Sequence, residues 1–247
     1  MLAIGSLAGC DAGVPLIPRS ETPMVYAILA RDSLLAGDSV VTALVANAGT
    51  ATSARYRPVE SFRMRRERDG TMFAWRIDSG RTGSFNIGPL STGVSIPDNI
   101  TMMRSWSPAG LGRDSLAAND SYLIDIRTMG AGITARVRMP ARPRPVLILR
   151  DGREVVAWST VPGAAGYAIR VDTDLSAQVA LRDTEYVLRR DRPDAELPPN
   201  PRFILTALDS NLVAFLTDPE GRAAGVGGAY GVIGGMTSEA IPLKRTP

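Results

Sequence analysis

The sequence predicts an all-β protein made of two β-sandwiches in tandem. Short runs of alternating apolar and polar residues recur along the chain, separated by Gly, Pro and Asp-Gly turn signals. Proline cannot donate a hydrogen bond to a strand ladder, so the segment 140–145 (PARPRP) predicts a break between two folded units. We therefore expect one sandwich at 24–141, a Pro-rich linker at 142–145 and a second sandwich at 146–247.

The residues before the first unit predict export and attachment to a membrane. Residues 7–10 (LAGC) form a small-residue site that ends in Cys10, the single cysteine of the chain. This site resembles the lipobox of bacterial lipoprotein signals, although the apolar stretch before it is short and follows no basic residue. The resemblance implies a signal remnant at 1–10, lipidation at Cys10 and a protein held in the bacterial cell envelope by its N-terminal lipid. Three prolines at 11–23 predict a flexible tether.

The clearest local signal in the first unit is a hairpin around the Asp-Gly pair at 69–70, a dipeptide favoured in two-residue turns. We predict antiparallel strands at 62–68 and 71–77, with Met64 opposite Trp75. A register shifted by one residue would move Trp75 to the solvent side, so the pattern favours this pairing. The apolar face of the hairpin would bury Phe62, Met64, Phe73, Trp75 and Ile77.

A second hairpin is expected at the end of the first unit. Segment 119–128 alternates, with Tyr122, Ile124 and Ile126 on one face, and 133–139 returns after a glycine turn with the same alternation. A Tyr-x-Ile-x-Ile strand, a Gly turn and a strand ending in Pro resemble the N-terminal domain of uncharacterised lipoproteins encoded beside TonB-dependent outer-membrane receptors. The resemblance implies an immunoglobulin-like sandwich and an envelope protein partner such as an outer-membrane receptor.

The second unit is organised around two strands, 155–159 and 167–171, whose aromatic residues Trp158 and Tyr167 would anchor the core. A Trp that ends one strand and a Tyr-x-Ile that opens the next resemble the fibronectin type III family. The family usually has a Tyr where this chain has Phe203, so the hydrogen bond that ties that corner is absent. The fold we expect is two tandem immunoglobulin-like and fibronectin type III-like β-sandwiches. The resemblance also implies three inward residues in a later strand: Phe203, Leu205 and Ala207.

Two further motifs favour structural over functional readings. The glycine-rich segment 221–235 lacks the spacing and the Lys of a phosphate-binding loop, so we expect a flexible loop followed by an edge strand. The net charge of the chain is only +3. A local group of arginines is therefore expected to be a solvated strand face, and we expect no nucleic-acid partner. That group is Arg63, Arg65, Arg66 and Arg68.

Composition excludes several kinds of chemistry. The chain has no histidine and one cysteine, which excludes imidazole catalysis, a Ser-His-Asp site, an internal disulfide and a Cys-based zinc site. Its acidic loop residues lack the spacing of a calcium loop, so we expect no metal, no cofactor and no catalytic residue. These observations favour a non-catalytic, lipid-anchored binding or interaction module for a receptor or a polymeric ligand. The alternative is a secreted carbohydrate-active enzyme with a carboxylate pair drawn from Asp114, Asp120 and Asp125.

Overall fold

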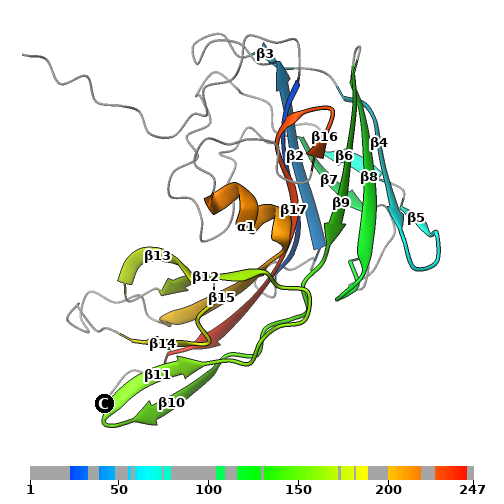
Figure 1. Ribbon diagram of the computed structural model, residues 1–247. Helices are drawn as coiled ribbons and strands as arrows, with labels where there is room; N and C mark the ends of the chain where they lie inside the picture. The colour runs from blue at the N-terminus through cyan, green and yellow to red at the C-terminus, as the bar shows by residue number, and fades with distance from the viewer. Residues whose placement is uncertain are drawn as a thin grey trace, which may run out of the picture.

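The computed structural model shows a protein made mostly of β-strands, with one short helix in the described part of the chain (Figure 1). The strands form sheets of nine, five and three strands, which agrees with the β-rich class that the sequence predicts. The predicted lipidation site Cys10 and nearly all of the predicted tether lie outside the described residues. The structure describes residues 23–32, 39–47, 55–56, 59–73, 75–78, 104–108, 116–128, 131–171, 174–180, 182–188, 200–217 and 226–243.

The nine-stranded sheet, called the large sheet below, runs in the order β13-β12-β15-β17-β1-β2-β7-β6, with β3 paired to β2. Its strands are β1 (Pro23–Asp32), β2 (Ser39–Asn47), β3 (Arg55–Tyr56), β6 (Trp75–Asp78), β7 (Arg104–Pro108), β12 (Gly166–Val171), β13 (Asp174–Ala180), β15 (Arg202–Leu208) and β17 (Tyr230–Pro242).

The two smaller sheets pack against different parts of the large sheet (Figure 1). The five-stranded sheet has the order β16-β9-β8-β4-β5, and the three-stranded sheet has the order β10-β11-β14. The five-stranded sheet comprises β4 (Val59–Arg66), β5 (Met72–Phe73), β8 (Ser121–Thr128), β9 (Ala131–Arg138) and β16 (Val226–Gly227). The three-stranded sheet comprises β10 (Val146–Arg150), β11 (Arg153–Ala157) and β14 (Glu185–Val187).

The long strand β17 connects the two units that the sequence analysis separates. Its residues 230–238 pair in parallel with β1, the first strand of the chain. Its residues 236–242 pair antiparallel with β15, which belongs to the second unit. The last strand therefore completes the sheet of the first unit. Besides the linker at 142–145, a continuous ladder of hydrogen bonds joins the two units.

The expectation of a flexible loop followed by an edge strand is wrong for residues 230–235, which belong to the central strand β17, whereas Val226–Gly227 form β16 at the edge of the five-stranded sheet. Gly231 has a φ of +106°, and a Cβ there would lie 2.0 Å from the carbonyl oxygen of Val25. A Cβ on Gly234 would lie 2.5 Å from Cγ of Leu212. The glycines allow β17 to approach β1 and the helix more closely than any side chain permits.

Two apolar cores hold the sheets together. The first lies between the five-stranded sheet and the middle of the large sheet. The predicted inward alternation of the second hairpin is confirmed, since its three aromatic and aliphatic residues are buried. The members of this core include Val25 and Leu29 from β1, Met64 from β4, Tyr122, Ile124 and Ile126 from β8, Val137 from β9 and Ile233 from β17.

The second core lies between the three-stranded sheet and strands β12 and β15. The predicted burial of Trp158 and Tyr167 is confirmed, with exposed fractions of 6% and 4%. Their rings meet edge to face with centroids 5.6 Å apart, and the Tyr167 hydroxyl accepts a hydrogen bond from the Val161 N–H at 2.8 Å. The strand at 202–208 also has the predicted inward residues, which belong to the same core: Phe203, Leu205 and Ala207.

The hairpin at Asp69 forms, but in a different register from the one predicted. Met64 pairs with Phe73 and not with Trp75, and a four-residue loop replaces the two-residue turn. The shift is two residues, so the alternation of faces survives, and Met64 and Phe73 are both buried as predicted. Trp75 belongs to β6, which pairs with β7 in the large sheet, so the second arm of the hairpin passes from one sheet to the other.

The loop lengthens because the Asp69 side chain has two partners. Its carboxylate accepts a hydrogen bond from the Thr71 N–H at 3.0 Å and binds the Arg66 guanidinium. Only Gly70 has a positive φ in this loop, whereas the predicted turn needs positive φ at both central residues. The Asp-Gly pair at 151–152 does form that turn, with φ of +51° and +72°.

The helix α1 (Ser210–Thr217) is a departure from the all-β expectation. Asp209 precedes it and caps it, because its carboxylate accepts a hydrogen bond from the Leu212 N–H at 2.9 Å. Leu212 and Phe215, three residues apart, are buried, and Leu212 lies against β17 at Gly234. The spacing of the buried residues in 210–217 therefore follows the period of a helix and not that of a strand.

The Pro-rich linker is fixed against β17. The Thr237 hydroxyl donates a hydrogen bond to the Pro140 carbonyl at 2.8 Å, and Arg142 forms an ion pair with Glu239. Pro143 and Pro145 are buried. These contacts add to the continuity that β17 provides between the two units.

We predict that Gly231→Ala destabilises the protein by at least about 3 kcal/mol, because strain adds to a clash with the β1 backbone. The control is Gly152→Ala, where φ is also positive but nothing lies within 4 Å of the added Cβ. That variant should lose only about 1–2 kcal/mol. Urea unfolding measures both changes, and equal losses would contradict the close approach of β17 to β1.

We predict that Trp158→Ala lowers the free energy of unfolding by about 3–5 kcal/mol, since it empties the centre of the second core. Leu149→Ala serves as the control, because Leu149 is 74% exposed. That change should stay within about 0.5 kcal/mol of the parent protein. A thermal transition unchanged by Trp158→Ala would refute the assignment of this core.

Candidate functional site

The outer face of the five-stranded sheet carries a row of arginines. Strand alternation turns Met64 inward, so Arg63 and Arg65, which flank it on β4, point away from the core. The register then aligns Arg65 with Leu123 and Arg136 across the sheet. An open groove of about 580 Å³ lies over these strands. We call this surface the arginine face and define it by Arg63, Arg65, Leu123, Asp125, Arg127, Thr134 and Arg136.

Positive charge is in excess on the arginine face. Arg127 pairs with Asp125 at 3.1 Å, and Arg136 pairs with Glu67 at 2.8 Å. Within the described part of the chain, the two outward-facing arginines of β4, Arg63 and Arg65, form no ion pair. Among the described residues, four guanidinium groups against two carboxylates leave an excess of two positive charges on this surface.

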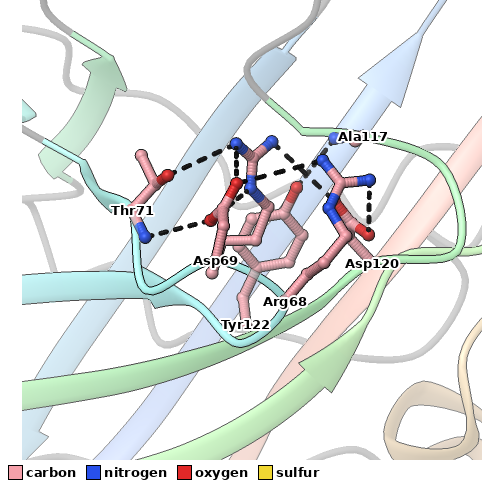
Figure 2. A network of polar contacts seen from close by, with 7 residues as sticks. Arg68, Asp69, Thr71, Ala117, Asp120 and Tyr122 are labelled. Carbon is pink, nitrogen blue, oxygen red and sulfur yellow. Dashed lines mark hydrogen bonds and ion pairs between the residues drawn. The ribbon is translucent and has the colours of Figure 1, made fainter.

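The other two arginines of the cluster are neutralised at the hairpin tip (Figure 2). Arg66 binds Asp69 through two hydrogen bonds, Nε to Oδ1 at 3.0 Å and Nη2 to Oδ2 at 2.7 Å. The Asp120 carboxylate lies 3.8 Å from Nη1 of Arg66 and 3.5 Å from Nη1 of Arg68. The hydrogen bonds from Arg66 and Thr71 hold the pKa of Asp69 well below its usual value. This network fixes the loop and leaves the arginine face to Arg63 and Arg65.

Tyr122 packs in the core beside the hairpin that carries Arg66 and Asp69. Its ring is fully buried and meets Phe73 edge to face, with centroids 5.7 Å apart. Its hydroxyl accepts a hydrogen bond from the Ala117 N–H at 2.7 Å (Figure 2). Burial raises the pKa of Tyr122, so the hydroxyl stays protonated near neutral pH.

The structure does not bring the predicted carboxylates together. Asp120 directly precedes β8 and is buried under the hairpin tip, whereas Asp125 lies within β8 and lines the groove on its outer face. Five residues of extended chain separate them by about 17 Å. Glycosidases need about 5–10 Å between the two carboxyl groups, so this pair does not have their geometry. Asp114 lies outside the described residues.

One buried carboxyl group stands apart from the arginine face. Asp209 is 1% exposed, and burial raises its pKa to about 7. One of its oxygens caps α1, and the other has no hydrogen-bond partner among the described residues. Its neighbours Gly234 and Gly235 belong to β17. The described ranges contain no group of three metal-ligating side chains.

Comparisons with known proteins add no family to this description. No protein-family model matches the chain, and a search of curated proteins finds no match. In the described ranges, no helix combines the length and apolar character needed to cross a membrane.

Arg63 and Arg65 can be recognised in the sequence, but their neighbours on β8 and β9 cannot. Arg136 reaches the same surface because β9 pairs with β8, which in turn pairs with β4. The alternation at 133–139 already indicates that Arg136 faces outward, but it does not indicate which strand lies beside it. Only the strand order places Leu123 between Arg65 and Arg136.

We predict that the free energy of unfolding decreases as the pH rises from about 4 to about 7. The pKa of Asp209 is about 7 in the folded protein and has a reference value of 3.8, so the folded state binds more protons in this range. Asp209→Asn keeps the cap and should remove this part of the decrease. The control Asp151→Asn, at an exposed turn, should retain it. Urea unfolding across this pH range measures the stability of both variants. Identical pH profiles for Asp209→Asn and Asp151→Asn would contradict the role of Asp209 in the decrease.

Proposed function

We propose that this protein is a non-catalytic, lipid-anchored protein of the bacterial cell envelope that acts as a binding or interaction module. The observation that carries the proposal is the arginine face, an open groove in which Arg63 and Arg65 form no ion pair with any described residue and lie near the exposed side chain of Met72. Arginine and methionine are enriched at protein interfaces, and Met72, which lines this groove, is 56% exposed. The charge of the groove suits an anionic partner, whether a receptor or a polymeric ligand.

The arrangement of sheets supports the two sandwich types as part of the proposal. In the second unit, β10-β11-β14 faces β13-β12-β15-β17 across the Trp158 core, a layout like that of fibronectin type III domains. In the first unit, the five-stranded sheet covers β1 and β17, as in an immunoglobulin-like sandwich with a shared strand. The likeness to lipoproteins encoded beside outer-membrane receptors makes such a receptor a reasonable partner.

We predict that Cys10→Ala moves the protein from the membrane fraction to the aqueous phase. Lipid on Cys10 would hold the parent protein in detergent during phase partitioning, and the variant has no thiol to modify. Partitioning of cells that express each protein provides the measurement. The control is Gly9→Ala, which keeps a small residue before Cys10 and should remain in the detergent phase. A Cys10→Ala protein that stays in the detergent phase would sink the lipoprotein assignment.

A further inference from the structure

We propose that the arginine face docks the protein onto an anionic bilayer, with Arg63 and Arg65 on the phosphate groups of lipid headgroups. The inference deepens the proposed function, on which it rests for the position of the protein at a membrane. It gives the groove one occupant, the headgroup layer of the membrane that holds the lipid anchor.

The chemistry of the two unpaired arginines fits phosphate. Arg63 and Arg65 lie two residues apart on β4, so their side chains leave the same face about 7 Å from each other. A guanidinium group presents a planar fork of donors that matches phosphate oxygens in pairs. Neither arginine loses an ion pair on binding, since neither forms one in the described part of the chain.

The apolar residues of the groove fit the same surface. Leu123 lies between Arg65 and Arg136 across the sheet, and Met72 lies opposite Arg65 on the other side. Met72 is 56% exposed. At a bilayer, such side chains can enter the boundary between headgroups and acyl chains.

The chain before β1 keeps the groove close to the bilayer. Twelve residues separate Cys10 from Pro23, and they can span at most about 40 Å. β1 begins beside the start of β17, and β17 follows β16, whose Gly227 lines the groove. A tether of this length gives a millimolar effective concentration, so even weak docking sets the orientation of the protein.

The test measures sedimentation with lipid vesicles and uses the full chain carrying Cys10→Ala, a variant that cannot be lipidated at this position. The unlipidated protein should bind phosphatidylglycerol vesicles, leave phosphatidylcholine vesicles unbound and dissociate as the salt concentration rises. Adding Arg63→Gln and Arg65→Gln should weaken binding by about 30-fold, because each arginine near an anionic surface contributes about five-fold. The matched control, Arg144→Gln with Arg153→Gln, removes the same charge from exposed positions elsewhere and should bind like the parent. Circular dichroism and thermal melting confirm that each variant is folded.

Four outcomes would overturn the docking proposal. They are no preference for phosphatidylglycerol, equal losses in the two double variants, release by inorganic phosphate at constant ionic strength, and binding only to an acidic protein. Release by phosphate would indicate a site for a soluble anion. Since the vesicle assay uses protein without lipid, its failure leaves the Cys10 assignment standing. Conversely, a Cys10→Ala protein that leaves the detergent phase but still binds phosphatidylglycerol vesicles through Arg63 and Arg65 would support both the anchor and the docking.

Discussion

The pairing of the last strand with the first is the constraint on which the rest of this structure depends. β1 has β2 on one side and β17 on the other. The large sheet is therefore incomplete until β17 has been synthesised. β17 then continues into the second unit through its ladder with β15. Contacts between segments this distant in sequence form slowly, because closing a long loop costs entropy before any contact forms.

The sequence around β17 follows from that central position. A strand with neighbours on both edges and packed layers on both faces leaves little room for side chains, and Gly231 and Gly234 occupy the two tightest contacts. The helix α1 also packs against β17, at Gly234. Asp209 both ends β15 and caps α1, which brings Leu212 against β17. The unusual pKa of Asp209 is thus a consequence of close packing against the shared strand.

Local pattern predicted the faces of strands better than their partners. Alternation correctly placed Tyr122 and Tyr167 inward, because the face of a residue depends only on its neighbours in sequence. The two Asp-Gly pairs show the limit. Asp151 makes the tight turn that an Asp-Gly pair favours, whereas Asp69 binds Arg66 and Thr71 in a longer loop. Glycine content suggested flexibility in β17, since the sequence does not reveal how closely another backbone approaches.

The same limit applies to the arginine face. The sequence shows that Arg63 and Arg65 point outward, but their significance depends on which charges lie beside them. The fold assigns Asp69 and Asp120 to the other two arginines of the cluster and leaves these two without an ion pair in the described part of the chain. The five-stranded sheet that carries them packs directly on β1, the strand that the tether enters. A shared apolar core therefore joins the sheet that carries the groove to β1, so a tether that enters β1 and the groove would act on one body.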